Sequence, residues 1–300
     1  MPDYHVGGHK IAAPTPPRGL YIVATPIGNM SDITLRALET LAGVDVIACE
    51  DTRVSGKLLK RYSIDTPLVS YHEHNASRIG PSLIARLQSG ASVALISDAG
   101  TPLISDPGHR LVVDARAAGI RVVPIPGASA SIAALSAGGM PVDSFLFEGF
   151  LPSKSVARKK RLEQLARIPA TLILYESPNR LEACLQDIAD CLGTQRRVAI
   201  CREISKLHEE FVSDTAEELA SRYRGRKVKG EIVLLVEPSQ GQNAINVVEL
   251  LSGLLEEMSV SRAASEAASI TGLPKRDIYQ QALELAQEKS MGKSGENGEQ

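Results

Sequence analysis

Aromatic side chains are scarce in this chain of 300 residues, which has no tryptophan, four phenylalanines and seven tyrosines. Proteins that hold single-stranded nucleic acids by stacking bases on aromatic rings need more rings than this, at short spacing. The nearest approach to a cluster is Tyr62 with Tyr71, or Phe145 with Phe147 and Phe150. The composition therefore argues against an aromatic stacking platform for bases.

An excess of one charge, a long apolar run and a cysteine framework are missing as well. Thirty-three basic and 35 acidic residues leave a formal net charge of −2, so no global positive field attracts a polyanion. No apolar run approaches the ~20 residues that a membrane-spanning helix needs, and the proline-rich start does not resemble a signal peptide. The cysteines form no CxxC pair and are too sparse for a disulfide framework. We expect a soluble cytoplasmic protein with no membrane anchor.

Short apolar runs alternate with helical periods along most of the chain. Apolar runs at 20–24, 44–49 and 93–97 are each followed by apolar residues at helical spacing, which favours βαβ units and a largely parallel sheet. A second series begins near Phe145, and beyond the linker-like stretch 238–243 the pattern is purely helical. The predicted fold class is α/β. The predicted divisions are a disordered tail over 1–18, α/β domains over 19–142 and 143–238, a helical segment over 244–288 and a disordered tail over 289–300.

Three loops rich in glycine, proline and small polar residues follow predicted strands. They are ATPIGNMSD at 24–32, SDAGTPLISDPG at 97–108 and PGASAS at 126–131. Ligands of open α/β sheets bind beyond the carboxyl ends of the strands, and three such loops at one edge indicate a ligand cleft. No GxxxxGK[ST] or GxGxxG pattern is present. The loops carry Asp98 and Asp106 instead, which suit a ligand with an amine and hydroxyl groups.

Further candidate residues lie outside these loops. Glu176, in LYESPNR, and Glu203 and Glu209 follow apolar strands and are candidate cleft residues. His72 and His74 lie two apart, which without a third ligand nearby is only a weak sign of a metal site. Polar loop histidines are the simpler interpretation, and we predict no metal.

Two basic runs interrupt the neutral average, at 154–161 and 222–229. Such runs are usually solvated faces, but two in one domain favour contacts to a phosphate backbone. Phosphate contacts position a nucleic acid without aromatic platforms. The helices near 261–283 resemble a helix-turn-helix, although acidic residues follow Lys275 and Arg276. A packing role and an RNA-docking role for this segment both remain open, and no DNA partner is expected.

Six stretches, in this order and spacing, resemble the tetrapyrrole-methylase superfamily: ATPIGNMSD, SDAGTPLISDPG, PGASA, EGFLP, LYESPNR and GEIVLLVE. Within it they are similar to the branch that methylates 16S rRNA on the ribose 2′-oxygen of a cytidine in the decoding region. The resemblance covers roughly residues 19–237 and extends to the helical segment. It implies an enzyme with two α/β domains that bind S-adenosylmethionine in the cleft between them. It further implies a homodimer that acts on 16S rRNA or the assembled small ribosomal subunit.

The resemblance also implies individual site residues. The cofactor-binding residues would be Asp98, Ala99, Gly100, Thr101, Asp106, Pro107, Gly108, Ser129 and Ala130. The substrate-binding residues would include Pro26 and Gly28, which match the first-strand loop. The two basic runs, and not the resemblance, add further predicted substrate-binding residues: Lys154, Arg158, Lys159, Lys160, Arg161, Arg224 and Arg226. The chain departs from the superfamily's Gly-Pro-Gly-Asp and Gly-Gly-Asp-Pro patterns, and both departures fit the RNA branch.

The catalytic group is left open by the sequence. A ribose 2′-hydroxyl must lose its proton as it attacks the methyl group, from a distance of about 3–3.5 Å. A general base adds ~10²–10⁴-fold, and Glu176, Glu203 and Asp98 are candidates that no spacing distinguishes. The alternatives to an rRNA methyltransferase are a tetrapyrrole (porphyrin or precorrin) methyltransferase and a non-enzymatic sensor of an adenosyl ligand.

Overall fold

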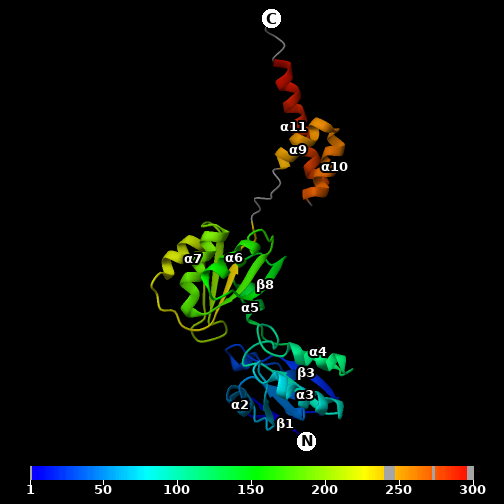
Figure 1. The fold of residues 1–300 in the computed structure, drawn as a ribbon, viewed down its shortest axis with the longest axis vertical. Helices are drawn as coiled ribbons and strands as arrows, with labels where there is room; N and C mark the ends of the chain where they lie inside the picture. The colour runs from blue at the N-terminus through cyan, green and yellow to red at the C-terminus, as the bar shows by residue number, and fades with distance from the viewer. Residues whose placement is uncertain (1, 240–246, 272–273, 296–300) are drawn as a thin grey trace. The chain divides into compact units, whose positions relative to one another are not determined.

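A computed structural model of the protein describes residues 2–239, 247–271 and 274–295. The chain divides into two compact units (Figure 1). The first comprises residues 1–166 and 170–237, and the second comprises residues 167–169 and 238–300. The predicted boundaries within 19–238 stay a prediction, because both sheets described below belong to the first unit.

The first sheet has five parallel strands in the order β5-β4-β6-β3-β7. Its elements, in chain order, are β3 (Gly19–Val23), α1 (Leu35–Gly43), β4 (Val46–Cys49), α2 (Thr52–Arg61), β5 (Leu68–Ser70), α3 (Ala76–Gln88), β6 (Ser92–Ile96), α4 (His109–Ala117) and β7 (Val122–Ile125). A short 3-10 helix, η1 (Met30–Asp32), precedes α1.

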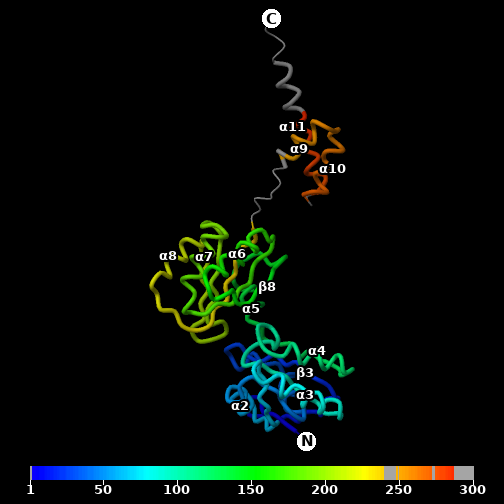
Figure 2. Tube along the Cα trace, in the orientation of Figure 1, coloured from blue at the N-terminus to red at the C-terminus, as the bar shows by residue number. Residues whose placement is uncertain are grey.

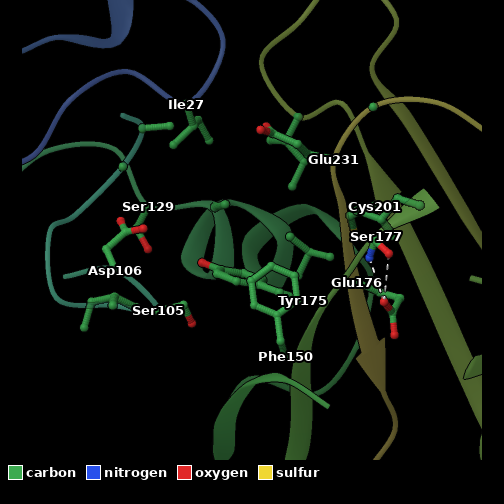
Figure 3. A pocket seen from close by; sticks show the side chains of 18 of the residues that line it. Ile27, Ser105, Asp106, Ser129, Phe150, Tyr175, Glu176, Ser177, Cys201 and Glu231 are labelled. Carbon is green, nitrogen blue, oxygen red and sulfur yellow. Dashed lines mark hydrogen bonds between the residues drawn. The ribbon is translucent and has the colours of Figure 1, made fainter. Parts of the chain in front are cut away.

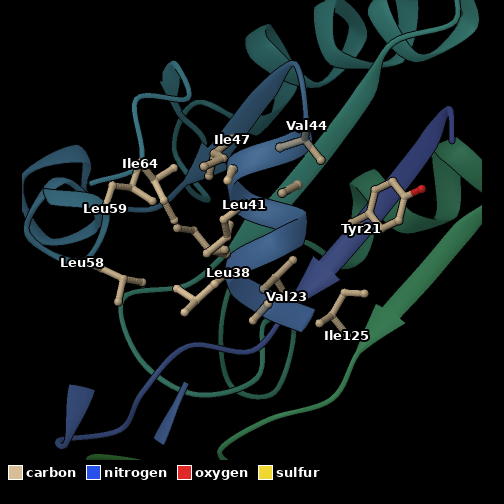
Figure 4. Packing of buried hydrophobic residues seen from close by; sticks show 14 of the residues in the cluster. Tyr21, Val23, Leu38, Leu41, Val44, Ile47, Leu58, Leu59, Ile64 and Ile125 are labelled. Carbon is tan, nitrogen blue, oxygen red and sulfur yellow. The ribbon is translucent and has the colours of Figure 1, made fainter. Parts of the chain in front are cut away.

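Strands β4 and β6 are buried along their whole length, as expected of parallel strands that are covered on both faces. Leu38 and Leu41 of α1 pack with Leu58 and Leu59 of α2 in one core cluster (Figure 4). The leucines of α3 and α4 pack in a second cluster with Leu20 and Leu95 of the sheet. The continuous apolar runs of the sequence are thus explained by burial between two helical layers.

The second sheet is mixed, in the order β11-β10-β12-β9-β8, and only β8 and β9 run parallel. Its elements are β8 (Phe145–Phe150), α6 (Ser155–Leu165), β9 (Thr171–Glu176), η2 (Pro178–Arg180), α7 (Leu181–Leu192), β10 (Arg197–Arg202), β11 (Glu210–Thr215), α8 (Ala216–Tyr223) and β12 (Ile232–Val236). Helix α5 (Ala130–Ala137) joins the two sheets along the chain (Figure 2) and packs Ala134 and Leu135 against β9 and β12. The predicted α/β class is confirmed.

The first residues are ordered, where the sequence analysis predicts a disordered tail. Strands β1 (Asp3–Val6) and β2 (His9–Ala12) form an antiparallel hairpin. Gly7 and Gly8 both adopt positive φ at its turn, which a two-residue hairpin turn of this kind requires. Tyr4 is only 2% exposed, in the same core cluster as α1. The segment is ordered because this ring is buried. The prolines of the segment obscured its strand pattern in the sequence.

The second unit is helical, as predicted. It contains α9 (Val247–Glu257), α10 (Val260–Thr271) and α11 (Lys275–Gly295), and its core is built from Leu251, Ala263, Ala264, Ala267, Ile278 and Ala282. Helix α11 includes residues 289–295, where we predicted a disordered tail, because each added residue extends an existing helix by one hydrogen bond. Residues 240–243 of the predicted linker and 296–300 of the tail lie outside the described residues. No helix within the described ranges is long and apolar enough to cross a membrane.

Candidate functional site

A cavity of about 320 Å³, called the main cavity below, is lined by loops and strands from both sheets of the first unit (Figure 3). Ile27 and Asp106 come from loops of the first sheet. Tyr175, Glu176 and Cys201 come from β9 and β10 of the second sheet. The cavity is of the size typical of small-molecule sites.

The three loops predicted to form a cleft are joined by backbone and side-chain hydrogen bonds. Thr25 and Gly100 exchange both backbone bonds, at 2.9 and 3.0 Å. Thr101 Oγ1 donates to the carbonyl oxygen of Ala128 at 3.2 Å. Gly100 has a φ of +74°, a conformation that glycine adopts without the steric cost of a side chain. The loops therefore present a fixed, largely backbone surface to a ligand.

The predicted cofactor residues separate into three groups. Those among the lining residues of the cavity are Ala99, Gly100, Thr101, Asp106, Ser129 and Ala130. Asp98 instead lines a neighbouring cavity. Pro107 and Gly108 are not among the described residues that line either cavity. Gly108 lies before α4 with a φ of +131°, and a Cβ there would come within 2.7 Å of Leu95 Cδ2, so close packing explains this glycine.

Carboxylates gather beside the first-sheet loops. Burial raises the pKa of Asp106, and the charge of Asp98 raises it further against a hydrogen bond from Ser97. Burial also raises the pKa of Glu50, with contributions from Asp98 and Asp106. Mutual repulsion of this kind makes the region favourable for a cation. Such a ligand relieves the repulsion when it binds.

The opposite wall is aromatic and apolar. Tyr175 packs edge-on against Phe147 and Phe150, with ring centroids 5.1 and 5.6 Å apart. Burial raises the pKa of Tyr175 and raises the pKa of the Cys201 thiol to about 12. Both groups are therefore neutral at physiological pH, and they exclude water rather than supply charge.

Glu176 is the one catalytic candidate that lines the main cavity. It is 3% exposed, its Oε1 accepts from Ser177 N at 2.7 Å and lies 3.2 Å from Arg180 Nε. Its Oε2 has no hydrogen-bond partner among the described residues. This oxygen is itself buried and does not face the cavity, and Ser177 and Arg180 hold the other carboxylate oxygen, so the carboxylate serves the packing of this wall.

The other two catalytic candidates lie elsewhere. Asp98 accepts from Asp51 N at 3.1 Å and lines the neighbouring cavity. Glu203 lines neither cavity as far as the structure describes them. Its Oε1 accepts from Lys206 Nζ at 2.7 Å and from Glu231 N at 2.9 Å, and Lys206 holds its pKa below the ordinary value. The remaining cleft candidate, Glu209, accepts from Ser205 N at 2.7 Å.

The neighbouring cavity, called the second cavity below, has a volume of about 200 Å³ and is lined in part by the predicted substrate residues Pro26 and Gly28. Three residues, Ile27, Ala99 and Glu231, line both cavities. Glu231 is a site residue that our sequence analysis missed. The signal in the sequence was its position after Gly230 at the start of GEIVLLVE. Gly230 has a φ of +97°, and a Cβ there would collide with the Glu203 side chain.

The predicted RNA-contacting residues are not all free to contact a phosphate. Arg158 is 3% exposed and donates to Asp187 at 2.7 Å, so its predicted phosphate contact is wrong, since its charge is already neutralised in the core. Lys159 pairs with Asp190 at 2.6 Å, and Arg161 makes two hydrogen bonds to Glu148. The exposed members are Lys154, Lys160, Arg224 and Arg226.

His72 and His74 lie with ring centroids 6.0 Å apart. In the described part of the chain, no group of three or more histidine, cysteine, aspartate or glutamate side chains is placed to hold a metal ion. The pair therefore gives no support to a metal site.

Comparison with known proteins identifies the family of this chain. The family model of tetrapyrrole (corrin/porphyrin) methylases matches residues 19–220. The chain belongs to this family. A second model, of the RsmI C-terminal HTH domain, matches residues 243–286.

Relatives match this chain over most of its length. A protein of Mesorhizobium japonicum is 53% identical over 97% of this chain and 100% of its own. One of Pseudomonas aeruginosa is 49% identical over 88% of this chain and 96% of its own. Both are named "Ribosomal RNA small subunit methyltransferase I".

Solved structures share the methylase fold at low identity. The cobalamin biosynthetic enzyme cobalt precorrin-4 methyltransferase is 18% identical with a TM-score of 0.57, covering 73% of this chain and 94% of its own. The Thermus thermophilus uroporphyrin-III C-methyltransferase complexed with S-adenyl homocysteine is 19% identical with a TM-score of 0.53, covering 73% and 97%. At these identities the likeness concerns the fold.

The cofactor of a methylase of this family is S-adenosylmethionine, and the residues of the main cavity fit it. The half-buried carboxylate of Asp106 suits its positive charges. Ala99, Gly100 and Thr101 line the cavity, so a ligand can lie against the backbone of their loop.

Proposed function

We propose that the protein transfers the methyl group of S-adenosylmethionine to ribosomal RNA of the small subunit. The acceptor would be the ribose 2′-oxygen of a cytidine in the decoding region of 16S rRNA. The observation that carries the proposal is the 53% identity to a ribosomal RNA small subunit methyltransferase over 97% of this chain. The site supports it with two contiguous cavities, one for each substrate of a transfer reaction.

The bound S-adenosylmethionine supplies an electrophilic methyl group. The loop around Gly100 orients it, and Asp106 complements its charge. Tyr175 excludes water from its side of the cavity, which strengthens these electrostatic interactions. Much of the acceleration comes from holding the ribose oxygen in line at about 3–3.5 Å from the methyl carbon. The proton of the 2′-hydroxyl passes to a carboxylate, and Asp98 and Glu231 are the exposed carboxylates that line the acceptor side.

The RNA backbone is proposed to contact Lys154, Lys160, Arg224 and Arg226, because their side chains are exposed. The proposal includes free 16S rRNA or the assembled small subunit as substrate, a homodimer and a cytoplasmic location.

The test is incubation with methyl-labelled S-adenosylmethionine and one of three acceptors: free 16S rRNA, assembled small subunits or a porphyrin precursor. Label in RNA, mapped by nuclease digestion to a 2′-O-methylcytidine, is the expected result. Label in the porphyrin precursor would establish a tetrapyrrole methyltransferase instead. Binding of S-adenosylmethionine without transfer to any acceptor would favour a sensor.

A further inference from the structure

Among the described residues that line the two cavities, Lys206 is the only one with a positive charge. It lines the second cavity, where Asp98 and Glu231 supply negative charge. Its side chain is 26% exposed, so it can still meet a ligand. The proposed function assigns this lysine no role.

The amino group of Lys206 is held between two carboxylates. Its Nζ donates to Glu203 Oε1 at 2.7 Å and to Glu231 Oε2 at 2.8 Å. Although burial lowers the pKa of Lys206, the hydrogen bonds to Glu203 and Glu231 raise it overall, so the group stays charged at physiological pH. An ammonium group has three N–H donors, and the third has no hydrogen-bond partner among the described residues. This third N–H is therefore available to a ligand.

The loop that carries Lys206 joins β10 to β11 and is fixed in an unfavourable backbone conformation. Glu203 has a φ of +53° and Ser205 a φ of +67°, and residues other than glycine rarely adopt such values. Ser205 N donates to Glu209 Oε2 at 2.7 Å, and Ser205 Oγ donates to the carboxylate of Asp32 in η1. Backbone strain that the surrounding structure maintains is found most often at functional sites.

The first-strand loop leaves space for this lysine at Gly28. A Cβ on Gly28 would collide with the Lys206 side chain and would come within 3.1 Å of the backbone oxygen of Ile204. Both Gly28 and Lys206 line the second cavity. The predicted substrate residue Gly28 thus lets Lys206 lie against the first-strand loop at this cavity.

We propose that Lys206 is a catalytic residue of the methyl transfer, whose third N–H donates to the ribose 2′-oxygen of the RNA. This rests on the proposed function. A lone pair of the 2′-oxygen forms the bond to the methyl carbon, and the carbon–sulfur bond breaks with its electron pair going to sulfur. The 2′-hydroxyl proton passes to a carboxylate that lines the second cavity, and Lys206 keeps its own protons. A fixed, charged donor stabilises the negative charge that develops on the attacking oxygen.

The first experiment measures the single-turnover rate of methyl transfer to whichever RNA acceptor the labelling test selects. Lys206→Met removes the charge, and Gly28→Ala displaces the lysine without changing it. The matched control is Lys10→Met, because Lys10 is ion-paired with Asp3 at 2.9 Å and is not among the described lining residues of either cavity. Circular dichroism verifies that each variant folds, and calorimetry measures its affinity for S-adenosylhomocysteine.

We expect Lys206→Met to lower the rate about 10²–10³-fold, as for the loss of one donor to a developing oxyanion. Gly28→Ala should lower it at least about tenfold by the same loss, and Lys10→Met should leave it unchanged. All variants should bind S-adenosylhomocysteine normally. The double variant Lys206→Met with Glu203→Gln distinguishes catalysis from charge pairing. If Lys206 served only to neutralise Glu203, the second substitution would restore the rate, and we expect it not to.

The second experiment involves no methyl transfer. Cytidine 5′-monophosphate and 2′-deoxycytidine 5′-monophosphate are titrated into the full chain, saturated with S-adenosylhomocysteine, and followed by NMR. The unmodified chain should prefer the ribonucleotide roughly three- to tenfold, the contribution of one hydrogen bond. Lys206→Met should bind the two nucleotides equally, and Lys10→Met should keep the preference.

Four results would overturn the inference: a normal rate in folded Lys206→Met, a restored rate in the double variant, no preference for the ribonucleotide in the unmodified chain, or loss of S-adenosylhomocysteine binding in Lys206→Met, which would assign the lysine to the donor site. If Lys206→Met does not fold, a normal rate in Gly28→Ala overturns it instead. Labelled RNA with any of these results rejects the inference and leaves the proposed function standing. An unmodified chain that labels no RNA rejects the proposed function, and the inference with it.

Discussion

At the scale of single residues, Asp106 is in an environment that disfavours its ionised form. Its carboxylate is half-buried with a raised pKa, so its charge is costly until a cation binds. We predict that Asp106→Asn weakens S-adenosylmethionine binding about tenfold, or ~1.4 kcal/mol, as measured by calorimetry. The control is Asp114→Asn on the solvent-facing side of α4, where Asp114 pairs loosely with Arg110 at 3.8 Å. Equal losses in both variants would contradict a specific role.

The same carboxylate predicts the pH dependence of binding. The cationic ligand prefers ionised Asp106, so affinity falls as pH drops through its raised pKa, and the fall begins at a higher pH than for an ordinary aspartate. Asp106→Asn should flatten this part of the profile. A carboxyl group whose pKa is raised in the folded state contributes to stability while it is protonated, and this contribution is lost as pH rises through the raised pKa. Asp106→Asn should therefore not lower the Tm at pH 7.

At the scale of elements, helix α6 presents two kinds of basic residue. Arg158 is buried against Asp187, whereas Lys160 two residues later is exposed. Removal of one partner of a buried ion pair leaves a buried charge, so Arg158→Ala should lower the free energy of unfolding by about 3–5 kcal/mol. Lys160→Ala should change it by less than about 0.5 kcal/mol. Urea denaturation distinguishes them, and equal losses would contradict the assignment.

Lys160 should instead affect RNA binding. A residue that contacts a phosphate contributes to the salt dependence of affinity, so Lys160→Ala should reduce the slope of log K against log salt by about 1. Filter binding to 16S rRNA at several salt concentrations measures the slope. An unchanged slope would remove Lys160 from the proposed contacts.

The N-terminal hairpin is a further element with a measurable contribution. Tyr4 is buried in the core cluster that contains α1, so Tyr4→Ala should cost about 3–5 kcal/mol of stability, as for other large aromatic truncations. His9→Ala, in the exposed strand β2, is the matched control and should be close to neutral in urea denaturation. A neutral Tyr4→Ala would show that the hairpin adds nothing to the core.

At the scale of the whole molecule, all described residues that line the main cavity belong to the first unit. S-adenosylhomocysteine at 100 times its Kd should stabilise that unit by about 2.7 kcal/mol. Hydrogen exchange followed by mass spectrometry should show protection of the three loops and α5, and unchanged exchange in α9, α10 and α11. Protection spread equally over the second unit would contradict this division.

From the sequence alone we could predict the alternation of strands and helices, the three loops and the helical second unit. These features follow from local periodicity and from the backbone preferences of glycine and proline, which act over a few residues. The loops that contain Ala99, Gly100 and Ser129 could be predicted for the same reason, since loops that follow parallel strands meet at one sheet edge. The cofactor role of these individual residues came from the resemblance.

Which basic side chains are free to contact a ligand could not be predicted without the three-dimensional fold. Arg158 and Lys160 are equivalent in the sequence, and the partner that separates them, Asp187, lies 29 residues from Arg158. Glu231 comes to line both cavities because packing brings together segments that are distant in the chain. Burial and pairing depend on such long-range contacts, which no local pattern encodes, so the tertiary structure alone placed the second cavity beside the first.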